Sequence, residues 1–341
     1  MSEQVRWGIL GCGGFCRRRI LTAFPHLTNA KIVAIQRRQQ HEADETAKTF
    51  GVPKAYTTRE ALLADPEVDA VIIGSHNAGH LEDVKAACAA GKHILCEKPL
   101  GLTALECRAM IAAAEEARVK LFVGHCGRYM NALQHCREAI AKGELGILAG
   151  MHATYHVRGK EGSWRMDSRT SGGGPLMDLG PHIIDLLRFI SSDEVVSVNA
   201  VTEPVRDLNT GQAELTVKAI LRFSKGTLAT MSLSYMEPFR NGFEVSGSSH
   251  TLRGDYNLSL IENENIRLMK ITSDPNPPHF ENIPILRREI YQLEIEDVSW
   301  AILDPTSMPT CATGEDGLMT AKIIDAIYKS GAHHGSEVKI A

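Results

Sequence analysis

From residue 5 to about residue 124 the chain alternates short apolar runs with amphipathic stretches. The apolar runs are VRWGIL, KIVAIQ, DAVIIG, HILC and KLFVG, at residues 5–10, 31–36, 69–74, 93–96 and 120–124. Stretches such as LEDVKAACAAG and TALECRAMIAAAEEAR lie between them and are typical of amphipathic helices. Strands that alternate with helices predict a parallel sheet covered on both faces. We therefore expect a doubly wound α/β domain over residues 1–124.

The pattern changes beyond about residue 150. Apolar and polar positions alternate in AELTVKAILRF, GTLATMSLSY and FEVSG, at residues 213–223, 226–235 and 243–247. A strand with one buried face alternates in this way, and the SKG turn at residues 224–226 fits a hairpin. Helical patterns follow at residues 131–142, 181–190, 315–330 and near 286–302. The chain from 125 to 341 thus predicts an α+β domain with an antiparallel sheet and helices on one side, which leaves the other face for a second copy to cover.

Composition narrows the class of protein. The chain has 341 residues, 43% of them hydrophobic and 23% charged, with a net charge of -4. This length suits two domains, and the lack of excess positive charge argues against nucleic acid or an anionic membrane as a partner. The first residues enter a strand pattern directly, and no apolar window reaches the length of a membrane span. We expect a cytoplasmic protein.

Eight cysteines raise the question of disulfides or metal. Free buried thiols are the expected state in a cytosolic chain of this size. The pairs Cys12/Cys16, His125/Cys126 and His135/Cys136 lack the paired CxxC spacing of a structural zinc site. No metal is predicted.

A glycine-rich turn, GCGGFC at residues 11–16, follows the first strand. It supplies Gly11 and Gly13 of a GxGxxG pattern and has Cys16 in place of the third glycine. Glycines let backbone amides approach a pyrophosphate at a helix amino terminus, where the dipole favours an anion. The cofactor-binding candidates in the turn are Gly11, Cys12, Gly13, Gly14 and Phe15, and the alternative is a tight turn without a ligand.

The end of the second apolar run bears on cofactor preference. NAD-selective sites usually carry an Asp or Glu there to accept hydrogen bonds from the ribose hydroxyls. This chain has Gln36, Arg37 and Arg38. Guanidinium groups attract a 2′-phosphate with a planar fork of donors. The pair predicts NADP as cofactor and keeps NAD as the alternative, with solvated surface arginines as the competing interpretation.

The fourth apolar run ends in CEKPLG at residues 96–101, which sets charge at the carboxyl end of a strand. Ligands of doubly wound sheets bind outside these ends, so Lys98 is a candidate to hydrogen-bond the oxygen that changes state during hydride transfer. Pro99 restricts the Lys98 backbone, and Glu97 is expected to hold the ammonium group. The alternative is a lysine whose stem packs and whose charge reaches water.

A second motif, SGGGPLMDLGPHIID at residues 171–185, combines a glycine triplet with a helix start. Gly180 and Pro181 suit the beginning of a helix and place His182 in its first turn. Asp178 precedes that turn, and Asp185 lies one turn later on the same face, where it could orient the imidazole. The triplet 172–174 lets the chain pass close to a flat ligand.

Together these segments resemble the Gfo/Idh/MocA family of oxidoreductases over nearly the whole chain. The resemblance rests on the glycine-rich turn, SHNAGH (75–80), GKHILCEKPL (91–100), FVGHCGRYM (122–130) and the 171–185 motif, of which the EKP triplet and D-x-G-x-H-x-x-D are specific. It implies an N-terminal Rossmann domain and a C-terminal α/β domain built on a large open, mostly antiparallel sheet. It also implies a homodimer or homotetramer that associates through that sheet.

By the same resemblance, His182 is the proton acceptor or donor, Lys98 polarises the reacting oxygen, and Asp178 holds a neighbouring hydroxyl. Further cofactor candidates are Ser75, His76, Asn77, His80, Glu97, Lys98 and Arg128, of which the three at 76, 77 and 80 either contact the cofactor or pack under it. Substrate candidates are Lys98, Tyr155, Trp164, Arg165, Asp178 and His182, with His156 beside them. His125 stands where relatives often carry an aromatic residue.

The leading hypothesis is an NADP-preferring oxidoreductase that acts on a sugar, polyol or related small molecule. RWGIL, FEVSG and ATGEDG resemble anhydrofructose reductases and related NADP-dependent sugar reductases. One alternative is an NAD-dependent glycosidase, which the arginine pair at 37 and 38 disfavours. The other is a non-catalytic, nucleotide-binding regulator, which would have no need of Lys98, Asp178 and His182.

Overall fold

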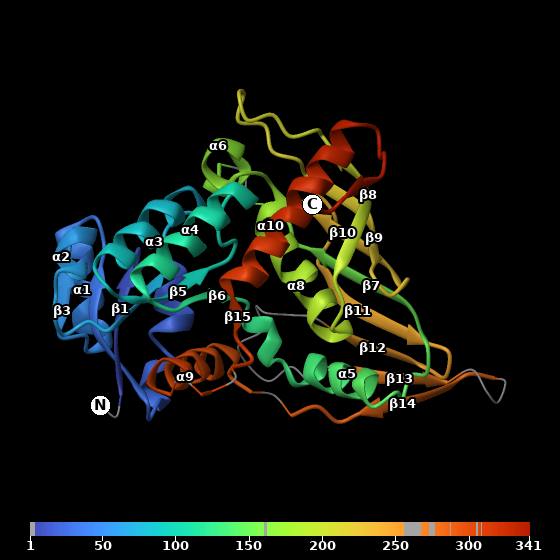
Figure 1. Ribbon diagram of the computed structural model, residues 1–341, viewed down its shortest axis with the longest axis horizontal. Coiled ribbons are helices and arrows are strands. Elements are labelled where there is room, and N and C mark those ends of the chain that lie inside the picture. The colour runs from blue at the N-terminus through green and yellow to red at the C-terminus, as the bar shows by residue number, and fades with distance from the viewer. Residues whose placement is uncertain are drawn as a thin grey trace. The chain divides into compact units, whose positions relative to one another are not determined.

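The computed structural model describes residues 4–159, 162–255, 267–272, 277–286, 288–304, 306–307 and 309–341. It contains two compact units (Figure 1). The first comprises the chain up to Cys126 together with Glu289–Ala321, and the second comprises Gly127–Arg288 and Lys322–Ala341.

The first unit is built on a seven-stranded sheet. Its order is β15 (Ala312–Thr313), β6 (Leu121–Gly124), β5 (His93–Glu97), β4 (Ala70–Ile73), β1 (Val5–Leu10), β2 (Ala30–Gln36) and β3 (Lys54–Tyr56). Every pair is parallel except β15 with β6. The central strand β4 is buried throughout, as expected for a parallel strand covered on both faces. The predicted doubly wound sheet is confirmed.

Helices connect these strands. They are α1 (Gln40–Phe50), α2 (Arg59–Leu63), α3 (His80–Ala89), α4 (Ala104–Ala117) and α9 (Ile290–Leu303), with short helices at Cys16–Ile20, Phe24–His26 and Asn77–Gly79. Thr58 and Thr103 cap α2 and α4, each accepting a backbone N–H from the first turn. A core of Leu, Ile, Val and Ala side chains from the strands and from α3 and α4 fills the space between sheet and helices.

Residues 289–321 return to the first unit, which the predicted division at residue 124 did not foresee. The fully buried Trp7 indole donates to Ser299 Oγ at 3.0 Å, and Asn29 Nδ2 donates to the Glu296 carbonyl at 2.8 Å. Both partners lie on α9, so this helix packs against β1 and β2. The domain limits 1–124 and 125–341 themselves stay a prediction.

The second unit is built on a nine-stranded, mostly antiparallel sheet, as predicted. Its order is β14 (His279–Ile283), β13 (Leu268–Thr272), β12 (Thr251–Asp255), β11 (Arg240–Gly247), β7 (Leu148–His156), β10 (Leu228–Ser234), β9 (Thr216–Phe223), β8 (Val195–Glu203) and β16 (Val338–Lys339). Among the described strands of this second sheet, only β7 and β10 pair in parallel. The predicted hairpin turn joins β9 to β10, with Gly226 at a φ of +94°.

Helices pack on one face of this sheet. They are α5 (Asn131–Ala141), α6 (Ser168–Ser171), α7 (Pro175–Asp178), α8 (Gly180–Ser191) and the last turns of α10 (Gly314–Ala332), with short helices at Cys126–Tyr129 and Trp164–Met166. α8 lies against β7 and β10 and buries nearly all of its residues. The opposite face carries exposed apolar side chains, namely Val196, Val201, Ile220, Leu228 and Phe280. Within the described residues, no helix has the length and apolar character needed to cross a bilayer.

Candidate functional site

The glycine-rich turn leaves the carboxyl end of β1 in a shape that requires glycine at residue 11. Gly11 has a φ of +67°, and a Cβ atom there would lie 2.7 Å from the backbone of Ser75. Its N–H donates to Gln36 Oε1 at 3.1 Å, and the Cys12 N–H donates to the Gln36 carbonyl at 3.0 Å. The turn is therefore tied to the ends of β2 and β4, at the edge where doubly wound sheets bind ligands.

Cys16 occupies the place of the third glycine and is fully buried. It begins a five-residue π-helix, in which the Leu21 N–H donates to the Cys16 carbonyl. Its thiol packs onto Gly74, at the end of β4, so closely that a Cβ on Gly74 would overlap Sγ. Because Gly74 has no side chain, it leaves the space that the Cys16 thiol occupies. A glycine at position 16 would not have needed this space.

This contact predicts a compensating pair of substitutions. Gly74→Ala should lower the free energy of unfolding by about 1–3 kcal/mol, because the new methyl group meets Sγ in a packed core. Cys16→Ala in the same chain removes Sγ and should restore most of the loss. Urea denaturation of the two single variants and the double variant measures the coupling, and strictly additive effects would contradict it.

The two arginines after β2 differ in their surroundings. The Arg37 guanidinium donates to Glu42 Oε2 at 2.7 Å and to Thr46 Oγ1 at 3.0 Å, both on α1. The Arg38 side chain is exposed. Arg37 is therefore held by the protein itself, and Arg38 is the guanidinium available to a ligand.

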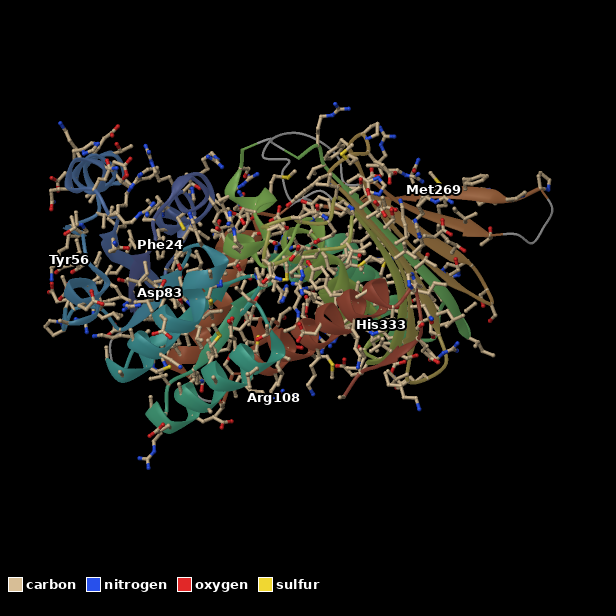
Figure 2. All side chains as sticks on the ribbon, turned by 90° about the horizontal axis from the view of Figure 1, so that it is seen from above. Phe24, Tyr56, Asp83, Arg108, Met269 and His333 are labelled. Carbon is tan, nitrogen blue, oxygen red and sulfur yellow. The ribbon has the colours of Figure 1, made fainter. Side chains whose placement is uncertain are left out.

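The loop at residues 75–80 is joined to the loop that follows β5. Ser75 Oγ donates to Asp83 Oδ2 at 2.6 Å on α3 (Asp83 is labelled in Figure 2). The His80 ring is fully buried, with one ring nitrogen 2.8 Å from the Pro99 carbonyl oxygen and the other 3.2 Å from that of Ser75. Burial lowers the pKa of His80 and favours the neutral ring, whose single N–H donates to one of these two oxygens. His80 thus packs between the two loops.

The remaining candidates of this loop, His76 and Asn77, differ in exposure. His76 is exposed, whereas Asn77 is 8% exposed.

Glu97 and Lys98 end β5 at the same edge of the sheet as the glycine-rich turn. The Glu97 carboxylate lies against Gly124 of β6, where a Cβ would stand 3.2 Å from it. Glu97 Oε2 accepts the Lys98 N–H at 3.3 Å, and a cis peptide bond follows between Lys98 and Pro99. Burial raises the pKa of Glu97 to about 7, with the nearby Lys98 acting in the opposite direction.

This raised pKa predicts a pH-dependent stability. Between the ordinary glutamate pKa of 4.5 and about 7, the folded chain binds a proton at Glu97 more tightly than the unfolded chain does. The free energy of unfolding therefore falls as the pH rises through this range and then levels off. Glu97→Gln removes this fall. The urea midpoint of Glu97→Gln should exceed that of the wild type by an amount that grows from pH 4.5 to 7. Glu115→Gln, at an exposed position on α4, should show no such growth.

In the second unit, Asp178 is the centre of a polar group. The Tyr235 hydroxyl donates to Asp178 Oδ2 at 2.8 Å, and Arg165 Nε lies 3.4 Å from Oδ1. The Arg165 guanidinium stacks 4.6 Å from the Trp164 ring. Burial raises the pKa of Tyr235, so the phenol stays a donor. Tyr235 was missed by sequence reasoning, although it is the last residue of the alternating run at 226–235 and directly follows β10.

His182 lies in the first turn of α8, as predicted, and is partly buried. Its ring centroid is 6.1 Å from that of Tyr155, which is the last residue but one of β7 and is 5% exposed. His156 follows Tyr155 and packs toward Ser232 at 2.7 Å and Glu237 at 3.2 Å. Tyr155, and not His156, is the β7 side chain next to the candidate acid or base.

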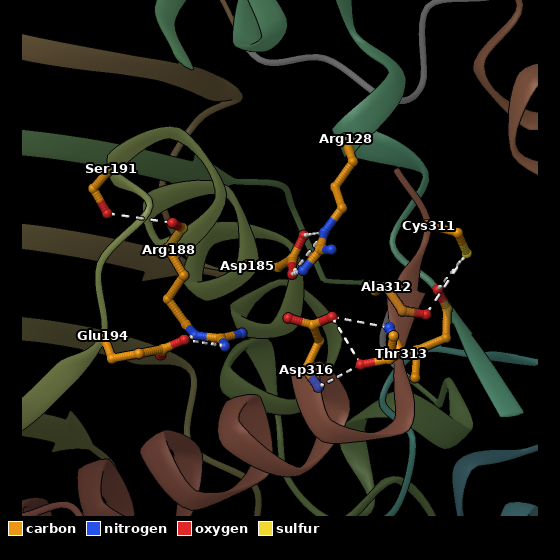
Figure 3. A network of polar contacts seen from close by, with 10 residues as sticks. Arg128, Asp185, Arg188, Ser191, Glu194, Cys311, Ala312, Thr313 and Asp316 are labelled. Atoms are coloured by element: carbon orange, nitrogen blue, oxygen red, sulfur yellow. Dashed lines mark hydrogen bonds and ion pairs between the residues drawn. The ribbon is translucent and has the colours of Figure 1, made fainter. Parts of the chain in front are cut away.

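Arg128 and Asp185 form a buried ion pair (Figure 3). Arg128 Nη2 donates to Asp185 Oδ1 at 2.6 Å and Nε donates to Oδ2 at 2.9 Å. At the other end of α8, Arg188 pairs with Glu194 at 2.7 Å. Asp185, which the sequence suggested as the partner that orients His182, thus fixes α8 through Arg128, a residue that the sequence assigned to the cofactor.

The glycine triplet is needed by the protein itself. A Cβ on Gly173 would overlap the Tyr328 hydroxyl, and one on Gly174 would overlap the Glu214 carbonyl. Glu214 is fully buried, and its Oε1 accepts the N–H groups of Gly174 at 3.0 Å and Leu176 at 2.9 Å. The interpretation that the triplet approaches a flat ligand is not required, because Tyr328 and Glu214 fill this space.

All eight cysteines lie in the described part of the chain and are buried thiols, as expected. No three His, Cys, Asp or Glu side chains of the described residues gather in a group that could hold a metal ion.

Comparison with known proteins identifies the family. Residues 5–125 match the oxidoreductase family with an NAD-binding Rossmann fold, and residues 133–253 match the GFO/IDH/MocA C-terminal domain. A 1,5-anhydro-D-fructose reductase of Ensifer adhaerens is 31% identical over 96% of both chains. A D-xylose 1-dehydrogenase (NADP(+)) of Haloferax volcanii is 28% identical over 98% of this chain and 99% of its own. A solved levoglucosan dehydrogenase in complex with NADH has 25% identity, a TM-score of 0.86 and 99% coverage of both chains. The chain belongs to the Gfo/Idh/MocA family of oxidoreductases.

Proposed function

We propose that this enzyme transfers a hydride between NADP and a hydroxyl or carbonyl carbon of a sugar, polyol or related small molecule. The observation that carries this proposal is the placement of Lys98. It leaves the carboxyl end of β5 in the same parallel sheet, and at the same edge, as the glycine-rich turn after β1. The sugar-acting relatives support the substrate class.

The glycine-rich turn fits a pyrophosphate beside Gly14, which carries no side chain to cover its backbone amide. The N–H groups of Gly11, Cys12 and Gly13 already donate within the protein. The nicotinamide supplies the hydride acceptor in the oxidation and the donor in the reverse reaction. In the oxidation the substrate carbon loses a hydride and its hydroxyl loses a proton. His182 takes that proton, Lys98 stabilises the oxygen as its charge develops, and Asp178 accepts a hydrogen bond from a neighbouring hydroxyl. Tyr235 and Arg165 hold the Asp178 carboxylate for this role.

The test is a panel of monosaccharides, anhydrosugars, inositols and diols, each incubated with NADP and separately with NAD, with absorbance at the reduced-nicotinamide band as readout. Carbonyl compounds with the reduced cofactors test the reverse direction. We expect turnover with at least one polyol or sugar and a preference for NADP. Nucleotide binding without any turnover would favour a non-catalytic regulator, and NAD retained through purification would favour a glycosidase.

Arg38 is the residue on which we base the NADP preference. Its exposed guanidinium would pair with the 2′-phosphate, which NAD lacks. Arg38→Ala should raise the KM for NADP by about 10-fold to 100-fold, the range for losing a charge-assisted hydrogen bond, and leave the KM for NAD unchanged. Arg108→Ala, at an exposed position on α4, should change neither value. An equal effect on both cofactors would contradict the assignment.

We also propose that the open face of the nine-stranded sheet pairs with a second copy of the chain. Val201, Ile220 and Leu228 stand exposed there beside charged side chains such as Lys218, which donates to Glu237 at 2.7 Å. One surface that carries both signs of charge can pair with itself across a two-fold axis. Light scattering should give at least twice the chain mass of 37.3 kDa, and Ile220→Asp should reduce it. A monomeric wild type would overturn the proposal.

A further inference from the structure

Asn241 lies opposite Tyr155, the aromatic neighbour of the candidate acid or base His182, in the second unit. It is the second residue of β11 and pairs with Tyr155 of β7 in the antiparallel register. Phe243 and Val245, which alternate with it along β11, are buried in the face that the helices cover. Directly opposed residues of antiparallel strands share one face of the sheet. Asn241 therefore lies on the same face as Tyr155, whose ring is 6.1 Å from that of His182.

The side-chain amide of Asn241 has one possible orientation. Its Oδ1 accepts the backbone N–H of His156 at 3.2 Å. A backbone N–H only donates, so the oxygen and not the nitrogen must face it. Nδ2 consequently points elsewhere. It exposes less than 1 Å² to solvent, and no hydrogen-bond acceptor for it exists within the part of the chain that the structure describes.

A buried amide nitrogen without an acceptor needs an explanation. Most buried polar side-chain atoms have a partner, because an unsatisfied donor loses its hydrogen bonds to water without replacement. Binding sites are the usual exception, since the missing partner arrives with the ligand. The cross-strand neighbour of Asn241 is Tyr155, whose ring lies 6.1 Å from that of His182.

We propose that Asn241 Nδ2 donates a hydrogen bond to a hydroxyl or ring oxygen of the substrate, which reaches the buried nitrogen by displacing the side chains that cover it. This inference rests on the proposed function and deepens it, because it assigns a specificity residue for an oxygen that does not itself react. Asp178 accepts a hydrogen bond from a substrate hydroxyl, whereas Asn241 supplies a donor. The site then offers an acceptor for a substrate hydroxyl hydrogen and a donor for the lone pairs of a substrate oxygen.

Asn241→Asp tests the inference because it retains the oxygen that accepts from His156 and removes both Nδ2 protons. We expect kcat/KM for the best sugar or polyol of the panel to fall about 10-fold to 100-fold. The KM for NADP should not change. Asn199→Asp is the matched control, since it makes the same charge change on β8 of the same sheet, where the amide is exposed and donates to the Gly335 carbonyl.

Deoxy analogues of the best substrate identify the oxygen involved. The wild type should lose about 10-fold to 100-fold in kcat/KM on the analogue that lacks the partner of Asn241, and Asn241→Ala should lose nothing further on it.

If the wild type is active and Asn241→Asp matches it on every substrate, the inference is wrong and the proposed function stands. A fall in urea midpoint without a change in kcat/KM would likewise overturn it and indicate a structural partner. An inactive wild type would instead count against the proposed function.

Discussion

Replacing Lys98 with methionine is expected to lower kcat by about 100-fold to 10,000-fold, the range for a positioned acid-base or polarising group. Methionine keeps much of the length of the lysine stem and removes the charge and the donors. Binding of NADP should survive, because the contacts assigned to the nucleotide come from the glycine-rich turn and Arg38. The measurements are steady-state kinetics with the best substrate and a direct titration of NADPH fluorescence.

Lys85→Met serves as the control for this substitution. Lys85 is exposed on α3, in the same unit, so its loss removes an equal charge from a position that is not at the end of β5. The control should keep full activity. Loss of NADPH binding in Lys98→Met would undo the assignment, because it would make Lys98 a cofactor anchor without a separate role in the reaction.

His182→Ala should lower kcat by a similar factor, about 100-fold to 10,000-fold, if the imidazole moves the proton of the reacting hydroxyl. The substitution opens a space beside the Tyr155 ring, which lies 6.1 Å from the His182 ring. Free imidazole can enter such a space and take over the proton transfer. Activity of the variant should therefore rise with imidazole concentration, whereas that of the wild type should not.

His279→Ala, on the exposed strand β14 of the same unit, is the control and should remain fully active. A His182→Ala variant that keeps kcat and only raises the KM of the substrate would contradict the proposed role. That result would make His182 a binding residue whose contribution is equal in the ground state and the transition state.

Much of the fold follows from patterns within single segments. The apolar runs at 5–10, 31–36, 69–74, 93–96 and 120–124 became β1, β2, β4, β5 and β6 with bounds that agree within about one residue. Gly180 and Pro181 begin α8 as expected, because glycine and proline suit the first positions of a helix. β7 and β8 were not predicted. The LAGMHATYH pattern of β7 is partly buried on both faces, so its alternation is weak.

Parts of the candidate site could not be predicted because they depend on segments far apart in the chain. Gly74 accommodates Cys16 from 58 residues away, and Tyr328 fills the space at Gly173 from α10. Asp185 is paired with Arg128, 57 residues earlier. Asn241 has no sequence motif of its own, and its buried donor becomes visible only in the register of β11 with β7.

The sequence by itself determined the class of each domain, the place of the glycine-rich turn and the candidate residues Lys98, Asp178 and His182. It could do so because strand and helix periods, glycine turns and helix starts depend on residues within a few positions of one another. Only the tertiary structure decided that Arg37 is bound to Glu42 while Arg38 is exposed, that Tyr235 holds Asp178, and that Glu97 lies against Gly124. Hydrogen bonding, burial and the pKa of a side chain depend on its neighbours in space, and the folded chain brings these together from distant segments.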